Sequence, residues 1–541
     1  MKFFKDKYDI VIIGGALSGL SSALKLLENG KDVLVLEQHN LPGGVATSYM
    51  RGGEEFEASL HELDAIGTKE NPLSTRKFFE RYGIEIDWIN IPVAYRYVDN
   101  EVDVTIHCGH NGDYSLPEKE IAQACGDQNG EILKKINKFF KLCLKVYKAM
   151  EDPNTTKMSS VKLLLKHGDF VKTIGYTYQE VLDACKLPKK VQSVLNAYWV
   201  YLGSPNKDMP FTINAYVLAD ILFYGGSIPR HTSYEMSIKL MDKVIEMGGQ
   251  VELKQRVDKI LVKDNHVTGV KLANGEIINT SYVICGAYPT FAYTKMIEPL
   301  SEVPKEAIKL INGMEIGVVP FIVSLLLDQD YHELGIEDYA TFSAPHGLDT
   351  DQIFEDSASI SDWGFYTCIC ANVANPEASK KGTTLYSITH LPKKEAFNNI
   401  SAEDYLKVKE EMVNYYLEAE SKRLGVNLKD HIIEIVTETP YTISRYCSSP
   451  FGAIYGYRHT MQNHVIARSM MKDEERYIKG LSFNGASQVL GAGMTPAIVN
   501  GRFAAEEILS DMEKENKSWE SRDFSKTLWA FSMSWKKEKP H

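Results

Sequence analysis

A glycine-rich turn near the amino terminus has the residue types and spacing that bind phosphate groups. Gly14-Gly15-Ala16-Leu17-Ser18-Gly19 follows an apolar run and precedes a stretch of helical periodicity. Backbone N–H groups at the start of such a helix, together with the helix dipole, favour a bound anion. Ala16 replaces the second glycine of the Gly-x-Gly-x-x-Gly pattern, so one methyl group enters the space where the backbone approaches the phosphates. The turn predicts a dinucleotide site, and its alternative is a tight strand-to-helix connection.

An acidic residue and a second glycine pair extend this pattern. Glu37 lies 23 residues after Gly14, at the end of a second apolar run, where a carboxylate accepts hydrogen bonds from the adenosine ribose. The segment 42–47, Pro-Gly-Gly-Val-Ala-Thr, then offers backbone amides to the pyrophosphate and flavin from the other side. A glycine pair after the acidic residue is characteristic of flavin binders and not of NAD dehydrogenases. We therefore predict non-covalently bound FAD, contacted by Gly14, Gly15, Ala16, Ser18, Gly19, Glu37, Gln38, Gly43, Gly44, Val45, Ala46 and Thr47.

Several regular elements must position these residues. Residues 8–13 and 32–36 are apolar, β-rich runs, and residues 18–29 between them have helical periodicity, which together predict a βαβ unit. Later, residues 233–247 predict a helix that leads into a β-meander over residues 250–278.

The carboxyl-terminal part of the chain predicts a similar arrangement. Residues 477–483 read as a strand, and a glycine-rich turn joins them to a helix from about Pro496 to Leu509, because proline is favoured in a first helical turn. A helix that begins there directs its positive end at the glycine turn, where it would stabilise an anionic reduced flavin.

The length of 541 residues exceeds what one hydrophobic core serves. Residues 118–222 are rich in helical patterns and aromatic side chains, whereas residues 315–445 alternate apolar strands with loops. The expected fold is α/β, a Rossmann-type, glutathione-reductase-like FAD-binding domain with an inserted α+β substrate domain. The predicted segments are 1–105, 223–290 and 446–510 for the FAD-binding domain, 106–222 for a helix-rich cap, 291–445 for a strand-rich substrate domain and 511–541 for a carboxyl-terminal tail.

The composition excludes some partners and compartments. Lys and Arg number 60 against 72 Asp and Glu, a net charge of −12, so no nucleic acid partner is expected. Eight cysteines without zinc-binding spacing predict no metal site and a reducing, cytoplasmic environment. The apolar run 11–27 carries glycines and is too short to span a membrane. The terminal lysines 536, 537 and 539 favour a solvated tail over a membrane anchor, and peripheral membrane contact stays open.

Residues 9–47, with Gly43-Gly44 after Glu37, resemble the amine oxidase and phytoene desaturase superfamily of FAD enzymes. Three further segments resemble its branch of carotenoid isomerases, bacterial phytoene desaturases and retinol saturases. The first is Glu-Phe-Glu-Ala-Ser-Leu-His at 55–61. The second is Gly-Gly-Ser-Ile-Pro at 225–229, which is followed by a helix and a meander that ends at 269–275. The third is 481–487 together with the glycine-rich stretch 491–496. Glu57 stands where the family more often has Asp. The resemblance covers nearly the whole FAD-binding part, whereas the two inserted regions, 118–222 and 315–445, match only loosely.

The resemblance implies further contacts with the cofactor. Val257 would meet the adenine through its backbone, and Ala287 would lie near the pyrophosphate. The residues implied along the flavin are Gly485, Ala486, Gly493, Met494, Thr495 and Pro496.

Candidates for catalysis and substrate binding carry weaker signals. His61 could supply a proton or be structural. Tyr446 belongs to a cluster of Tyr and Arg side chains that could line the pocket, and Arg230 and Arg445 could bind a substrate carboxylate. No second glycine turn suits NADPH, so we expect an external electron donor or acceptor, or a reaction without net redox change.

Three functions remain open. The leading hypothesis is an FAD-dependent oxidoreductase or isomerase that acts on carbon–carbon double bonds of a hydrophobic polyunsaturated lipid, a carotenoid, retinoid or other isoprenoid, by desaturation, saturation or cis/trans isomerisation. An unsaturated fatty acid isomerase or reductase is the second enzyme hypothesis. A non-catalytic FAD-binding redox sensor or membrane-docking protein is the alternative from another class.

Overall fold

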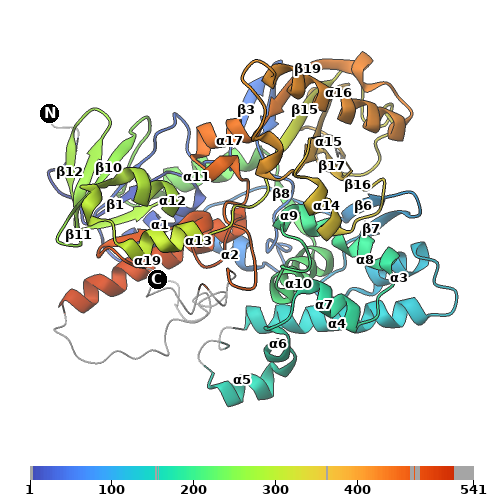
Figure 1. The fold of residues 1–541 in the computed structure, drawn as a ribbon, viewed down its shortest axis with the longest axis horizontal. Helices are drawn as coiled ribbons and strands as arrows, with labels where there is room; N and C mark the ends of the chain where they lie inside the picture. Colours follow the sequence, from blue (N-terminus) through green and yellow to red (C-terminus); the bar gives the residue numbers. More distant parts are fainter. Residues whose placement is uncertain are drawn as a thin grey trace.

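The structure, a computed structural model, describes residues 4–152, 155, 158–360, 364–463, 468 and 476–516. Figure 1 shows one part of the molecule built from blue, yellow-green and red segments, that is, from both ends and the middle of the chain. A second part contains a sheet with the helix α16 (Tyr405–Leu424), and a third is a group of helices around α4 (Glu131–Glu151). The terminal lysines 536, 537 and 539 lie outside the described residues.

The first part is built on a five-stranded parallel sheet. Its order is β20-β13-β1-β2-β9, and its strands are β1 (Ile10–Ile13), β2 (Val33–Leu36), β9 (Gln250–Glu252), β13 (Tyr282–Cys285) and β20 (Leu481–Phe483). Ile10 and Ile12 pack with the helices on one face, and Val11 and Ile13 pack with a second sheet on the other. A parallel sheet buried on both faces explains why these runs are continuously apolar. The Rossmann-type prediction is confirmed.

The two faces of this sheet are covered by different layers. Helices α1 (Leu17–Glu28), α11 (Thr232–Glu246) and α19 (Met494–Asn516) pack together on one face. On the other lies a four-stranded sheet of order β12-β11-β10-β14, with β10 (Val257–Lys263), β11 (His266–Leu272), β12 (Ile277–Asn279) and β14 (Ile297–Glu298).

The second part is built on a seven-stranded sheet of order β19-β15-β18-β17-β16-β6-β7. Its strands are β6 (Val93–Val98), β7 (Asp103–His107), β15 (Phe321–Leu327), β16 (Ala340–Ser343), β17 (Tyr366–Cys370), β18 (Thr384–His390) and β19 (Ile432–Glu438). Helix α16 covers one face through Met412, Tyr416 and Leu417.

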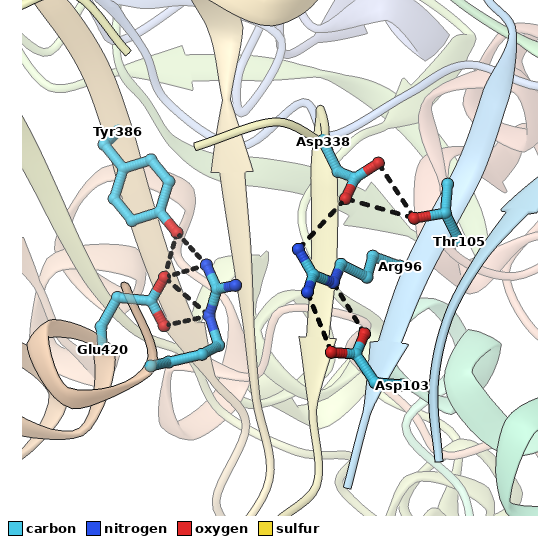
Figure 2. A network of polar contacts seen from close by, with 7 residues as sticks. Arg96, Asp103, Thr105, Asp338, Tyr386 and Glu420 are labelled. Carbon is cyan, nitrogen blue, oxygen red and sulfur yellow. Dashed lines mark hydrogen bonds and ion pairs between the residues drawn. The ribbon is translucent and has the colours of Figure 1, made fainter. Parts of the chain in front are cut away.

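Two polar clusters tie this part together (Figure 2). Arg96 of β6 donates to both carboxylate oxygens of Asp103 on β7, at 2.8 and 2.9 Å. Glu420 of α16 is fully buried and accepts hydrogen bonds from Arg423, at 2.9 Å, and from the hydroxyl of Tyr386 on β18. A buried carboxylate is tolerated only with such partners, so the second cluster fixes α16 to the sheet.

The helical wall contains short helices grouped around α4. They are α3 (Ser115–Ala124), α5 (Ser160–Lys166), α6 (Gly168–Thr173), α7 (Tyr178–Ala184), α8 (Lys189–Leu195), α9 (Trp199–Leu202) and α10 (Phe211–Ala219). Helix α10 packs along α4 and ends in a π-helical turn, Asp220–Tyr224. The helix-rich texture predicted for this region is confirmed.

The remaining elements connect these three parts. They are the ribbons β3 (Ser48–Arg51) with β4 (Glu54–Glu57) and β5 (Trp88–Ile91) with β8 (Gly226–Pro229), and the helices α2 (Ser74–Arg81), α12 (Pro289–Phe291), α13 (Lys305–Gly313), α14 (Thr350–Asp356), α15 (Ala371–Ala374) and α17 (Pro440–Cys447). Among the described helices, none combines the length and apolarity that crossing a bilayer requires.

The structure differs from the predicted segments, strand pairing and helix ends in several places. Strands β6 and β7 lie within the predicted segment 1–105 but complete the seven-stranded sheet, and β14 lies after residue 290 but pairs with β10. Strand β9, predicted as part of the meander, pairs with β2 instead. Such pairings depend on contacts distant in sequence, which a local pattern does not contain. Helix α19 also begins two residues before Pro496 and extends beyond Leu509, because amides in a first helical turn need no intrahelical acceptor.

The two ends of the chain meet where α1 crosses α19. A Cβ atom at Gly501 would lie 2.0 Å from the carbonyl oxygen of Ser18. Ser22 Oγ donates to the carbonyl of Gly501 at 2.7 Å, and Ser21 Oγ donates to that of Ile498 at 2.6 Å. Small residues on both helices therefore allow backbone contact.

We expect Gly501→Ala to destabilise the fold by about 2 kcal/mol, because the added methyl group forces the two helices apart. Thermal unfolding of the purified protein measures the effect. Gly313→Ala is the matched control, since a Cβ atom there meets no atom within 4 Å. Equal melting temperatures for the two variants would contradict the close-contact role of Gly501.

Candidate functional site

A cavity of about 410 Å³ lies where the five-stranded sheet meets the other two parts. Its position at the carboxyl ends of parallel strands is the usual binding place in such folds, and its volume suits a ligand. The predicted cofactor residues in its wall are Gly14, Ala16, Ser18, Glu37, Gln38, Gly43, Gly44, Val45, Ala46, Val257, Ala287, Gly485, Ala486, Gly493, Met494, Thr495 and Pro496. Gly15, Gly19 and Thr47 lie outside the wall.

The amino-terminal glycine turn forms a cradle. Gly14 has a φ of 104°, a backbone conformation that favours glycine, and its N–H donates to the carbonyl of Leu36 at 2.8 Å. A Cβ atom at Gly44 would lie only 3.0 Å from the Ala16 methyl group. The Ala16 side chain therefore occupies space that Gly44 leaves open, which explains why the turn accepts alanine at this position.

Gly19 has a different role from the predicted one. A Cβ atom at this position would lie 2.0 Å from the carbonyl oxygen of Gly14 and 3.4 Å from Ile12. It would point toward β1 and not into the cavity, so the glycine serves close packing of the helix on the strand. Gly15 is similarly restricted, because its Cβ atom would lie 3.1 Å from that of Glu37.

Glu37 is held at the end of β2 beside this turn. It is buried. Its Oε2 accepts a hydrogen bond from the Gly15 N–H at 2.7 Å, and its Oε1 accepts one from the His39 N–H at 2.8 Å. Each carboxylate oxygen keeps a further lone pair, so the group can accept hydrogen bonds from ribose hydroxyls while its orientation is fixed.

The opposite end of the cradle is formed by the turn before α19. Gly485 and Gly493 have φ values of 66° and 127°. Asn500 Nδ2 donates to the carbonyls of Gly485 and Gly491 at 2.8 and 2.9 Å, which holds the turn against the first residues of the helix. The sequence analysis missed Asn500, and a buried amide within a helix beside a glycine-rich turn is the signal that could have indicated it. Two glycine cradles and a fixed carboxylate fit FAD.

His61 and Glu62 line the cavity next to each other. Burial lowers the pKa of His61 to about 4, so its imidazole is neutral at pH 7. Burial raises the pKa of Glu62 to about 8, so this carboxyl group keeps its proton at pH 7. The Tyr201 hydroxyl donates to Glu62 Oε1 at 2.9 Å, and Glu62 Oε2 is buried without a hydrogen-bond partner among the described residues.

These two residues change the expected assignment of the proton donor. A neutral imidazole is a very weak acid, which disfavours His61 in that role. Glu62 holds an available proton and was missed by the sequence analysis. No sequence signal indicated it, because an acid in the stretch Leu60-His61-Glu62-Leu63-Asp64 looks like a surface residue until its burial is known.

A second group of buried acids comprises Asp64, which lines the cavity, and Glu151 and Asp220, which do not line it. Burial raises the pKa of Asp64, and burial with repulsion from Asp64 and Glu151 raises that of Asp220. The Tyr147 hydroxyl donates to Asp220 Oδ1 at 3.2 Å, and the Tyr216 hydroxyl donates to Glu151 Oε1 at 2.8 Å. Burial thus disfavours the charged form of each of these carboxyl groups.

The remaining candidates lie away from Glu62. Tyr446 lines the cavity, but 55% of it is exposed and its ring meets that of His39, close to Glu37, which does not suit a proton donor at the buried end. Arg445 is exposed and lines no described cavity. Arg230 lines an adjoining cavity of about 170 Å³ and pairs with Asp87 at 2.6 Å.

The chain resembles known flavoproteins along most of its length. The model of the flavin-containing amine oxidoreductase family matches residues 17–509. A chloroplastic prolycopene isomerase of Daucus carota is 24% identical over 535 residues, which cover 95% of this chain and 82% of that protein. The all-trans-retinol 13,14-reductase of Danio rerio is 23% identical, covering 90% and 83%. A 4,4'-diaponeurosporene oxygenase of Staphylococcus haemolyticus is 23% identical, covering 92% and 96%.

Solved structures agree on the fold. A putrescine oxidase double mutant superimposes with a TM-score of 0.63 at 12% identity, covering 93% of this chain and 99% of that one. An oxidoreductase from Methanosarcina mazei gives 0.58 at 15% identity, covering 93% and 100%. Because the family model extends from α1 through both inserted parts to α19, the chain belongs to the flavin-containing amine oxidoreductase family and binds FAD.

Proposed function

We propose that this enzyme acts on a carbon–carbon double bond of a hydrophobic isoprenoid, of the carotenoid or retinoid class. The names of three relatives support the substrate class, because they specify prolycopene, retinol and diaponeurosporene. The observation that carries the proposal is the protonated carboxyl group of Glu62 in a largely apolar wall that continues into the FAD cradle.

The wall around Glu62 suits an uncharged chain. Its apolar residues come from α9, α10, the π-helical turn and the strand-rich part, and they are Val200, Leu202, Val217, Ile221, Pro320, Ile322, Leu391 and Ile454. Arg256 is the basic residue in the described cavity wall, and it lies next to Val257, at the predicted adenine end. Arg230 is engaged by Asp87. This arrangement supports an isoprenoid over a fatty acid, which would need a cation for its carboxylate.

Different residues serve cofactor binding and proton transfer. Glu37 and the two glycine cradles would hold FAD, which when bound supplies the two-electron chemistry of a carbon–carbon bond. Glu62 holds a proton for a substrate carbon, and Tyr201 fixes the orientation of its carboxyl group. Because Glu62 is protonated at pH 7, it favours proton donation over abstraction, which favours saturation or cis/trans isomerisation over desaturation.

Electrons for a net redox reaction would come from or go to an external partner, since no nicotinamide site was predicted in this chain. We place the enzyme in the cytoplasm with peripheral membrane contact, because an isoprenoid substrate resides in lipid.

Glu37→Ala is expected to weaken FAD binding about tenfold or more, because a lost charge-assisted hydrogen bond costs about 1.5–3 kcal/mol. Fluorescence titration of the flavin-free protein measures the dissociation constant. Glu28→Ala is the control, since Glu28 lies at the end of α1 and pairs with Lys25 and Arg81. An unchanged dissociation constant in Glu37→Ala would remove Glu37 from the ribose site.

Glu62→Gln is expected to lower turnover about a hundredfold without loss of FAD, because the amide has no acidic proton. Prolycopene and all-trans-retinol are the test substrates, with dithionite-reduced enzyme under anaerobic conditions and products separated by chromatography. Wild-type turnover should be present below pH 8 and fall as the pH rises through the Glu62 pKa of about 8. This descending limb should disappear from the residual activity of Glu62→Gln.

His61→Gln is the matched control, because it changes the neighbouring residue of the same wall. Full activity in Glu62→Gln together with a hundredfold loss in His61→Gln would return the proton donor to His61. If the wild type turns over no polyene, the proposed function is wrong.

A further inference from the structure

Helix α5 exposes an apolar face. None of its seven residues is buried, and Val161, Leu164 and Leu165 are 68%, 50% and 81% exposed. Their spacing of three and four residues places them on one side of the helix. Figure 1 shows α5 at the edge of the helical wall, beyond α6 and α4. Tyr176, in the turn after α6, is also half exposed. An apolar surface of this kind indicates an interaction site.

The neighbouring helix α4 presents a row of lysines. Lys134, Lys138, Lys141, Lys145 and Lys148 recur every three or four residues, and all five are exposed. The opposite side of α4 is buried. Residues 131–172 contain ten lysines and four acidic residues, in a chain whose net charge is −12. The positive charge is thus concentrated on this face.

The apolar and basic features are joined into one surface. Helix α6 packs on α4, and α5 packs on α6. Lys145 of α4 pairs with Asp169 of α6 at 2.5 Å, and Lys166 of α5 pairs with Asp152 after α4 at 2.5 Å.

Other lysines on this surface form no ion pair with the described residues. In the part of the chain that the structure describes, no carboxylate lies within ion-pair distance of Lys138, Lys141, Lys148 or Lys162. These side chains can therefore meet an external anion.

We infer that the exposed face of α5 and the lysine row of α4 dock the protein on an anionic bilayer surface. The leucines would enter the acyl region while the lysines meet lipid phosphates, as in interfacial amphipathic helices. The inference rests on the proposed function, because an isoprenoid must be taken from a lipid phase. Helix α10 packs on the inner side of α4 and lines the cavity through Val217. Helices α4 and α10 therefore lie between the lysine row and the site.

Vesicle sedimentation tests the docking surface without substrate. The FAD-loaded protein should sediment with phosphatidylcholine vesicles that contain phosphatidylglycerol, and salt should weaken this binding. Leu164→Asp with Leu165→Asp, and separately Lys138→Glu with Lys141→Glu, should each lower the partition coefficient about tenfold or more. Retained FAD in both variants shows that they are folded.

Matched controls come from α16, in the strand-rich part. Leu406 is 72% exposed there, and Lys407 and Lys422 are exposed. Leu406→Asp, and Lys407→Glu with Lys422→Glu, should leave vesicle binding unchanged. Wild-type binding in both α5 and α4 variants would overturn the inference. So would absence of vesicle binding by the wild type, or capture of the lysine row by a short nucleic acid without any vesicle binding.

The assay also separates this inference from the proposed function. Glu62→Gln should bind vesicles like the wild type, whereas the docking variants should turn over detergent-dispersed polyene normally and vesicle-embedded polyene slowly. Vesicle binding that depends on α5 and α4 supports docking even if no polyene is turned over. Equal loss of activity in detergent and in vesicles would overturn the docking role.

Discussion

Ser18, in the first turn of α1, lies against Gly501 in the first half of α19, and this backbone contact joins the two ends of the chain. This contact places β20 at the edge of the five-stranded sheet that contains β1. It also places the first turn of α19 beside the Gly14 turn. Both helices then direct their amino ends toward one cavity, where their dipoles favour negative charge. The cofactor site therefore exists only when segments some 480 residues apart in the sequence pack together. The inserted parts add the remaining walls to this frame.

Burial controls the chemistry of the cavity wall. The same loss of solvent lowers the pKa of His61 and raises that of Glu62, because burial disfavours whichever form is charged. Two neighbouring ionisable residues thus become neutral at pH 7, and only one of them holds an acidic proton. An apolar substrate meets a wall without net charge at this point. Burial raises the pKa of Asp64 and of Asp220 by the same rule.

The sequence predicted the parts of the site that depend on local backbone chemistry. The Gly14 turn, Glu37 and the glycine-rich turn before α19 were identified because glycine and helix starts leave short-range signals. Burial and strand pairing leave no such signal. Glu62 looks like any surface acid until Tyr201 and Gly226 enclose it, and β6 joins its sheet through β16, more than 240 residues later. Gly19 shows a third case, where the residue was identified but its packing role required the position of β1.

The helical wall has a basic outer surface, which faces solvent, and an apolar inner surface, which faces the cavity. Helix α4 turns its lysines outward and packs Phe139 and Phe140 inward, while α10 behind it contributes Val217 to the cavity. Exposing an isoprenoid to water costs about 0.8 kcal/mol for each methylene group, so a long chain would not cross open solvent at a useful rate. In a protein that rests on the bilayer through α5 and the lysine row, helices α4 and α10 lie between that row and the site. The substrate proposed for the cavity and the lipid proposed for the surface are thus consequences of the same apolar chemistry.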